Sequence, residues 1–368
     1  MIQNIAPWHF HNEFHNVPPS GDDLVLDIDE NGILLASDSL RPPRMCEWKK
    51  AGGRAALTYA FCLTADDAPK NDVGNDGQKK DTDSAVRSAE KTCDERGRAA
   101  VPAESDKGRH AGEPAAAESP FRPEAPSWIA EQKSDAAPHS FDSAMSAFRP
   151  FVHMFGEMRC FLALRGAGES FPAPEGWVRI APSALRGHPA PLPFAAATAL
   201  HLFRWYNGHR FCGRCGSPVR HSNTERALVC PDCGEVCYPV IAPCVLVAVT
   251  CGEKILLTRY ARPGASRLVL VAGFVEIGET AEQAAAREVM EETGLRIRNL
   301  RYVGSQPWGF SGTLATGFAA ELDGPDAIRL DTSELAEARW VSRADIPPCP
   351  DESSLTMTMI SRFARGDL

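Results

Sequence analysis

The stretch that most constrains this chain is residues 273–295, which specify a helix with sharply defined ends. Thr280 and Gln283 have the spacing of a capping box, in which side chains satisfy free backbone N–H groups at a helix start. Gly294 suits the left-handed backbone of the residue just past a helix end, because it has no Cβ. Four small or aliphatic side chains between these ends can pack inward: Ala281, Ala284, Ala285 and Val289. The stretch therefore predicts a helix with one buried face.

The same helix carries a crowded acidic face. Glu288, Glu291 and Glu292 stand at positions i, i+3 and i+4, so their carboxylates lie on one side of the helix. Like charges at this spacing repel by roughly a few tenths of a kcal/mol per pair. Carboxylate oxygens are preferred ligands of magnesium and manganese, and a bound cation would relieve the repulsion. A solvated acidic face is the commoner explanation of such a cluster, and spacing alone leaves both open.

The whole stretch resembles a known motif. It matches the Nudix box, G-x5-E-x7-R-E-U-x-E-E-x-G-U with U a bulky aliphatic residue, at every fixed position. Resemblance to the Nudix hydrolases implies an α/β/α sandwich in which the box forms a loop, a helix and a loop. It also implies that the three glutamates hold catalytic Mg²⁺ or Mn²⁺, supported by Glu279 and Arg287. Either Glu291 or Glu292 would serve as the general base or position it.

A cysteine cluster precedes the box. Two C-x-x-C pairs are separated by fourteen residues, and their members are Cys212, Cys215, Cys230 and Cys233. Four thiolates at this spacing give the closed tetrahedral shell of structural Zn²⁺, and a closed shell leaves no position for a catalytic water. A redox pair or four unrelated thiols are the weaker alternatives, and Cys237 fits the spacing less well. A zinc ribbon is therefore predicted.

A second motif follows the box. Residues 305–310 read S-Q-P-W-G-F and resemble the S-Q-P-W-P-F-P-x-S substrate signature of the NADH pyrophosphatase branch of the family. Gly309 and Ser311 replace two prolines of that signature, and Thr313 replaces its serine. Losing both prolines is expected to make the loop more flexible, because proline restricts the backbone. The departures bear on selectivity for nicotinamide more than on hydrolysis.

The resemblance also nominates substrate-binding residues and one further metal ligand. Trp308 and Phe274 could stack on a nicotinamide or adenine ring, with core packing as the alternative. Gln306 of the signature and Tyr238 are the other candidates for substrate binding. Glu334 matches the acid beyond the box that completes the metal site, and Glu337 is a neighbouring alternative.

The rest of the chain divides by composition. Residues 24–28 and 33–36 flank Asn31-Gly32, a dipeptide typical of a tight hairpin turn. Further strands are predicted at 151–155, 160–164 and 177–180, and a helix at 193–206. Polar and small residues dominate 64–139, which predicts disorder. The predicted organisation is an α+β chain: a β-rich N-terminal domain over 1–63 and 140–193, a disordered insertion over 64–139, a helix plus zinc ribbon over 194–240, and a Nudix domain over 241–368.

The net charge, the apolar runs and the cysteines bear on the binding partners and the location of the protein. A net charge of −9 over 368 residues argues against a general nucleic-acid or membrane-surface binder. No run of 18 apolar residues and no signal-peptide core are found, so a cytoplasmic location without membrane attachment is expected. The twelve cysteines would then stay free thiols, apart from those on zinc.

Together these features predict metal-dependent hydrolysis of the pyrophosphate bond of NADH or NAD, giving AMP and nicotinamide mononucleotide. Two or three Mg²⁺ or Mn²⁺ ions would bridge the glutamates and the pyrophosphate. The branch also implies removal of NAD caps from RNA 5′ ends, and a homodimer. Two alternatives remain: a Nudix hydrolase of ADP-ribose or diadenosine phosphates, and a zinc-ribbon binding module with degenerate activity. Metal-dependent turnover distinguishes the last of these from the enzymes.

Overall fold

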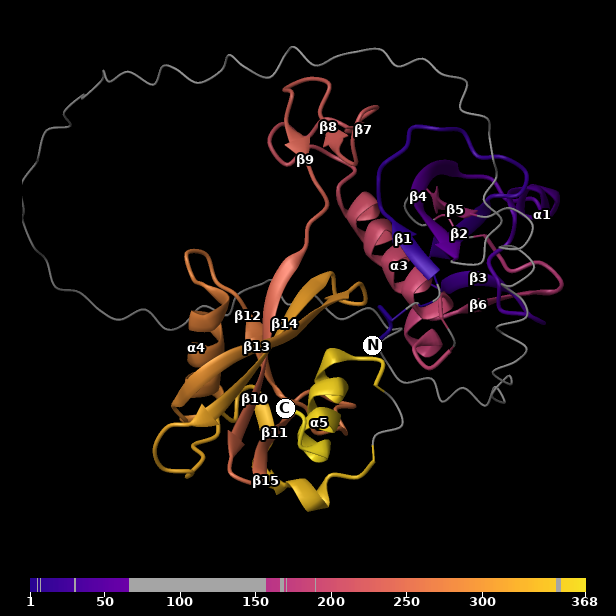
Figure 1. The fold of residues 1–368 in the computed structure, drawn as a ribbon. Helices are drawn as coiled ribbons and strands as arrows, with labels where there is room; N and C mark the ends of the chain where they lie inside the picture. Colours follow the sequence, from indigo (N-terminus) through magenta and orange to yellow (C-terminus); the bar gives the residue numbers. More distant parts are fainter. Residues whose placement is uncertain are drawn as a thin grey trace, which may run out of the picture. The chain divides into compact units, whose positions relative to one another are not determined.

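The computed structural model describes residues 1–65, 157–165, 171–188, 190–348, 352–368 and Glu169, except positions 5, 7 and 30 (Figure 1). The predicted insertion at 64–139 lies outside these residues apart from its first two, which end a strand. The predicted strand at 151–155 also lies outside them. No described helix is long and apolar enough to cross a membrane.

The N-terminal part of the chain forms a six-stranded sheet with the order β1-β4-β5-β2-β3-β6. The strands are β1 (Trp8–His11), β2 (Leu24–Asp29), β3 (Gly32–Ala36), β4 (Ala56–Ala65), β5 (Glu157–Leu164) and β6 (Trp177–Ile180). The predicted hairpin is confirmed, because β2 and β3 pair antiparallel with Asp29 opposite Gly32. The strand predicted at 160–164 is β5, which lies between β4 and a parallel β2.

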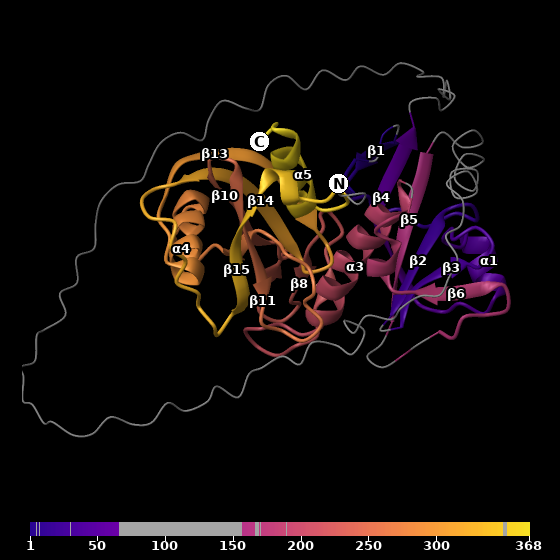
Figure 2. The same cartoon turned by 90° about the horizontal axis from the view of Figure 1, so that it is seen from below.

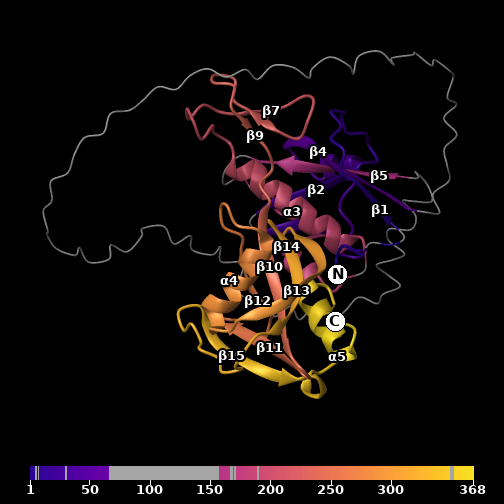
Figure 3. The ribbon, with the colours of Figure 1, turned by 60° about the vertical axis from the view of Figure 1, so that its left-hand side comes forward.

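Helices cover both faces of this sheet. Helix α3 (Leu192–Gly208) lies along one face (Figures 2 and 3), and its Ala196, Ala199 and Leu200 share a core with Leu26 and Phe61. The short α1 (Met45–Lys50) covers the other face through Met45 and Trp48. The predicted helix at 193–206 is therefore confirmed, with one residue more at its start and two at its end.

A buried ion network lies inside this sheet. Asp27 is fully buried and accepts hydrogen bonds from Arg165, from Arg179 Nη2 at 2.8 Å and from Trp48 Nε1 at 2.6 Å. Removing the carboxylate would leave the buried Arg165 guanidinium without its counter-charge and Arg179 with Asp29 alone, at 3.2 Å. Breaking a buried ion pair in this way typically costs about 3–5 kcal/mol.

Asp27→Ala is therefore expected to lower the free energy of unfolding by roughly 3–5 kcal/mol, measured by urea unfolding followed through tryptophan fluorescence. Asp22→Ala is the matched control, because Asp22 is half exposed and pairs with Arg44 at the surface. A loss below about 1 kcal/mol in Asp27→Ala would show that the network contributes little to stability.

The C-terminal part forms a second six-stranded sheet with the order β13-β14-β10-β11-β15, in which β12 also pairs with β10. The strands are β10 (Ala242–Cys251), β11 (Lys254–Tyr260), β12 (Val271–Phe274), β13 (Ile297–Trp308), β14 (Thr313–Leu322) and β15 (Leu335–Ser342). β10 and β14 are parallel, and the other pairs are antiparallel.

One helix packs on each face of this second sheet (Figure 1). Helix α4 (Ala281–Thr293) buries Ala284, Ala285 and Val289 against one face, and α5 (Leu355–Arg365) buries its apolar side against the other. Side chains alternate along β10, so Val247 faces α4 while Ala248 faces α5. The predicted α/β/α sandwich is therefore confirmed.

Candidate active site and zinc site

The ends of α4 are built by local interactions. Gln283 N–H donates to Thr280 Oγ1 at 3.2 Å, and Thr280 N–H donates to Gln283 Oε1 at 2.9 Å. Gly294 ends the helix in the left-handed conformation with φ +69°. Both predicted caps are confirmed. They fix the register of the helix, and with it the direction in which the three glutamates project.

Arg287 forms hydrogen bonds with three of the glutamates at the acidic face. Its Nε and Nη2 donate to the two oxygens of Glu279 at 2.8 and 2.9 Å, and its Nη1 donates to Glu288 at 2.7 Å and Glu291 at 2.9 Å. Nη2 also donates to the backbone oxygen of Phe274 at 2.9 Å. These bonds hold the pKa of Glu279 near 2. Arg287 thus ties the loop before the helix to two of the predicted metal ligands.

Glu292 is the unusual group of the site. Its side chain is buried, with 3% of the residue exposed, and neither carboxylate oxygen has a hydrogen-bond partner. Burial, together with the nearby carboxylates of Glu288, Glu334 and Asp331, raises the pKa of Glu292 to about 8. A buried carboxylate without a partner is costly. Its two free oxygens, on a face with other carboxylates, fit the oxygen-rich coordination that Mg²⁺ and Mn²⁺ require.

Glu288 reaches its place because the neighbouring strand has no side chain there. A Cβ on Gly273 of β12 would lie 1.9 Å from Glu288 Cδ, closer than any real contact. Burial raises the pKa of Glu288, although Arg287 opposes this rise. The first glycine of the box therefore clears the space that the Glu288 carboxylate occupies.

The structure separates the two candidate acids beyond the box. Glu337 lies on β15 and pairs with Arg259 at 3.1 Å and Arg339 at 3.2 Å. Glu334 comes just before that strand, and its charge raises the pKa of both Glu288 and Glu292. Glu334 is therefore the better placed of the two, and its role as a metal ligand stays a prediction.

Two further residues lie near the glutamates and are not among the site residues predicted from the sequence. Asp331 raises the pKa of Glu292, and Tyr260 lies close enough to Glu292 for burial and that charge to raise the tyrosine pKa to about 12. Tyr260 ends β11 and pairs with Leu335 of β15. Strand pairing places Tyr260, and the backbone N–H of Asp331 donates to the backbone oxygen of Glu292 at 3.0 Å. Both contacts join segments far apart in the chain, so local sequence carries no signal for them.

The predicted aromatic residues lie at one end of the sheet. Phe274 is 56% exposed, and its backbone oxygen is bound by Arg287. A cross-strand row joins Phe274 to Gln306 through one residue on β10 and one on β14. At about 4.8 Å per strand, Phe274 and the start of the signature are roughly 14 Å apart, which a dinucleotide can span. Trp308 is half-buried two residues further along β13.

The remaining two candidates have other partners. Gln306 is 1% exposed; its Nε2 donates to Ser353 O at 3.1 Å and its Oε1 accepts from Leu355 N at 2.6 Å, at the start of α5. Tyr238 is exposed, and its hydroxyl donates to Glu225 at 3.2 Å. Substrate contacts of both residues stay predictions.

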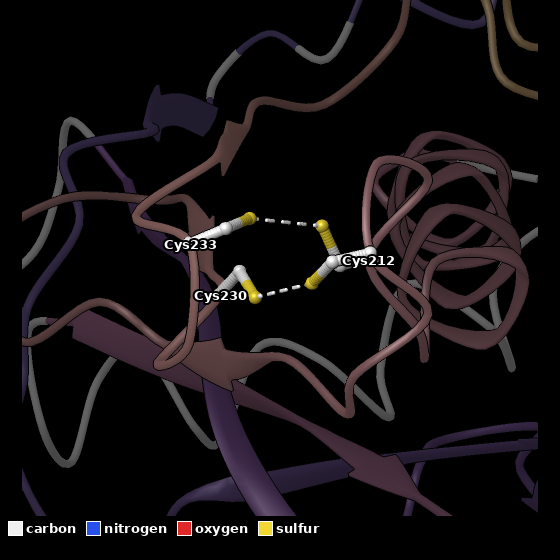
Figure 4. A group of neighbouring side chains, drawn as sticks. Cys212, Cys230 and Cys233 are labelled. Atoms are coloured by element: carbon white, nitrogen blue, oxygen red, sulfur yellow. Dashed lines mark hydrogen bonds between the residues drawn. The ribbon is translucent and has the colours of Figure 1, made fainter.

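The four cysteines converge as predicted. Their Sγ atoms all lie within 4.8 Å of one another, with Cys212 and Cys233 at 3.6 Å and Cys215 and Cys230 at 3.4 Å (Figure 4). A tetrahedral zinc with bonds of about 2.3 Å separates its sulfurs by about 3.8 Å, so small shifts admit the ion. Hydrogen bonds from Ser217 lower the pKa of Cys215 to about 6, whereas burial and the three neighbouring thiols raise the pKa of Cys233 to about 12. Zinc binds the thiolate form of both, so its binding releases protons.

The cysteines hold a small ribbon of three strands, β7 (Arg220–His221), β8 (Leu228–Val229) and β9 (Val236–Cys237) (Figure 1). Gly216 and Gly234 follow the two cysteine pairs with φ of +79° and +76°, which glycine adopts readily. The Cys237 thiol is directed to the Tyr238 carbonyl at 3.7 Å instead of to the cluster. Among the described residues, this quartet is the one group of three or more possible ligands gathered so closely. The site is a structural zinc site.

Comparison with known proteins agrees with these two sites. Residues 240–358 match the model of the NUDIX domain, and residues 208–238 match that of the NADH pyrophosphatase zinc ribbon domain. Relatives include proteins named NAD-capped RNA hydrolase NudC from Salmonella heidelberg and Salmonella schwarzengrund, each 46% identical over 165 residues. That alignment covers 45% of this chain and 64% of each relative.

Among solved structures, a NUDIX hydrolase from Nitrosomonas europaea is similar to part of this chain. It is 26% identical, covers 42% of this chain and 90% of its own, and has a TM-score of 0.37. The two domain matches fall on the sandwich and on the cysteine ribbon, where the structure places the acidic helix and the zinc ligands. The chain is thus similar to the NUDIX domain over residues 240–358 and to the NADH pyrophosphatase zinc ribbon domain over residues 208–238, and it spans 64% of the length of the relatives it matches.

Proposed function

We propose that this protein hydrolyses the pyrophosphate bond of NADH or NAD in the presence of Mg²⁺ or Mn²⁺, giving AMP and nicotinamide mononucleotide. The observation that carries the proposal is the buried carboxylate of Glu292, whose oxygens have no partner on a Nudix helix. The zinc ribbon of NADH pyrophosphatase type and the names of the relatives favour a nicotinamide dinucleotide over other nucleoside diphosphates.

The glutamates and Arg287 of α4 would have different roles in the hydrolysis. The cations would be held by Glu288, Glu291, Glu292 and Glu334. When bound, they supply the positive charge that neutralises the pyrophosphate oxygens and activates a water. Arg287 keeps Glu288 and Glu291 in place through its hydrogen bonds. Glu291 is the better candidate for the general base, because its side chain is 58% exposed and can accept a proton from water, whereas Glu292 is buried.

The exposed Phe274 ring offers a stacking surface for a nicotinamide or adenine base beside these carboxylates. Such a contact is worth about 0.5–1.5 kcal/mol beyond the burial of area. Trp308 offers a second ring at the same end of the sheet. Two rings at one end of the sheet, one of them on the strand whose backbone binds Arg287, suit a substrate with two flat bases joined by a pyrophosphate.

The same site would accept an RNA that begins with NAD, because the capped end presents the same pyrophosphate bond. The relatives named NAD-capped RNA hydrolase support this extension. A short 5′ end needs few phosphate contacts, so the net charge of −9 is compatible with it. The homodimer, the cytoplasmic location and the division into domains at 63, 139, 193 and 240 stay predictions of the sequence.

The proposal is tested by incubating the purified chain with NADH, NAD and ADP-ribose in the presence of Mg²⁺ or Mn²⁺. Products are separated by chromatography. We expect AMP and reduced nicotinamide mononucleotide from NADH, and none from the double variant Glu291→Gln/Glu292→Gln. Glu282→Gln is the matched control, because this exposed glutamate of α4 belongs to the first turn, away from the acidic cluster.

Each other outcome has a definite meaning. If ADP-ribose were hydrolysed and NADH were not, the Nudix chemistry would stand and the nicotinamide substrate would be rejected. No turnover of any of the three would reject the proposal and favour the binding-module alternative.

A further inference from the structure

The signature loop of this chain lies against a helix outside the Nudix domain. A Cβ on Gly309 would lie 2.1 Å from the backbone oxygen of Ala197, in the middle of α3. Backbone atoms cannot move away as a flexible side chain can. Only glycine therefore fits here, and the replacement of the usual proline follows from this close approach.

Two more residues of α3 hold the same loop. Arg204 Nη1 donates to the backbone oxygen of Phe310, whose ring packs on the core that α3 shares with the N-terminal sheet. His201 Nε2 lies 2.9 Å from the backbone oxygen of Val240, and a Cβ on Gly312 would lie 3.3 Å from the same nitrogen. Burial lowers the pKa of Arg204, which remains a cation.

Ala197, His201 and Arg204 stand at positions i, i+4 and i+7, so they form one continuous face of α3. We call these three residues the α3 template. They contact the chain at three backbone positions of the loop and of the segment before β10. The sequence predicts a flexible loop, since two prolines are missing, and the template supplies the restraint from outside.

We infer that the α3 template fixes the substrate loop of this enzyme, with Arg204 as a positioning residue for the dinucleotide site. The inference rests on the proposed function and deepens it. Trp308 lies next to the restrained segment, with the Arg186 guanidinium 5.0 Å from its ring and the Phe310 ring 4.8 Å away. A loop released from α3 would let this indole leave the position in which it can stack on a base. Substrate affinity would therefore depend on residues outside the Nudix match at 240–358.

Steady-state kinetics on the full, zinc-loaded chain with Mg²⁺ provides the test. Arg204→Gln is expected to raise KM for NADH about tenfold, the size expected for one charge-assisted hydrogen bond, while kcat changes less than about threefold. Arg204→Lys, which keeps a donor, should recover part of the affinity. Arg301→Gln is the matched control, because Arg301 is an exposed arginine of β13 and its loss should leave KM unchanged.

Gly309→Pro gives a sharper outcome. It restores the usual residue of the family, yet the close approach of Ala197 predicts that it raises KM in this chain instead of improving it. A lower KM in Gly309→Pro, or an unchanged KM in Arg204→Gln, would overturn the inference.

A second readout does not depend on activity. Hydrogen exchange of the amides at 310–313 should become faster in Arg204→Gln, while the amides of α4 and the ribbon exchange as in the unchanged chain. Unchanged exchange at 310–313 would reject the α3 template even if NADH is not the substrate. Absence of NADH hydrolysis by the unchanged chain, with faster exchange in the variant, would reject the proposed substrate and keep the template.

Discussion

Glu292→Gln is expected to stabilise the cation-free protein and to lower kcat/KM by roughly 10³-fold, or about 4 kcal/mol of transition-state stabilisation. The gain in stability follows from the pKa of Glu292, which is about 8 in the folded chain against an ordinary value of 4.5. A carboxyl whose pKa rises on folding binds protons more tightly in the folded state, so stability falls as pH rises from about 4.5 to about 8. At pH 7 this cost is on the order of 3 kcal/mol, and glutamine carries no charge to bury.

Thermal melts in EDTA and in Mg²⁺ measure the effect. The variant should melt above the unchanged protein in EDTA at pH 7. The difference should vanish well below pH 4.5, where the unchanged side chain is protonated in both states. Mg²⁺ should raise the melting temperature of the unchanged protein more than that of the variant, because binding to the folded state stabilises it. Glu282→Gln should melt at the same temperature as the unchanged protein in EDTA and in Mg²⁺. A variant that melts lower in EDTA and keeps its activity would contradict the assignment of Glu292 to the cation site.

Gly273→Ala is expected to lower kcat/KM by roughly 10²-fold or more, because a misplacement of about 1 Å at a reacting site has effects of this size. The added methyl group would take the space of the Glu288 carboxylate, which lies 1.9 Å from that position. The side chain can swing away, so the fold should survive and one cation ligand should be lost.

Isothermal titration with Mn²⁺ and the rate of NADH hydrolysis measure this change together. Weaker Mn²⁺ binding and slower hydrolysis should appear with little change in melting temperature. Gly304→Ala is the matched control, since a Cβ there would lie an ordinary 3.9 Å from Leu355 Cδ1. Full activity in Gly273→Ala would show that Glu288 does not need this position.

Some contacts of the candidate site join residues close in sequence, and others join residues far apart in the chain. The sequence could predict the first kind much better than the second. The helix at 281–293, its capping residues and the shared face of its glutamates follow from interactions over four residues or fewer. The four cysteines are similar, because each pair is positioned by its own tight turn and one metal ion joins the pairs. For these elements the pattern of residue types was sufficient.

Tertiary structure decided the rest, because side chains far apart in the chain meet only through strand pairing and helix packing. The preference for Glu334 over Glu337 depends on where β15 begins beside β11. The burial of Gln306 depends on the start of α5, and Gly309 depends on a carbonyl of α3 more than a hundred residues away. The sequence by itself determined the acidic helix with its caps and the gathering of the four cysteines. Only the tertiary structure decided that the Glu292 carboxylate is buried without a hydrogen-bond partner. The physical reason is that burial depends on all the elements packed around a residue and not on its neighbours in sequence.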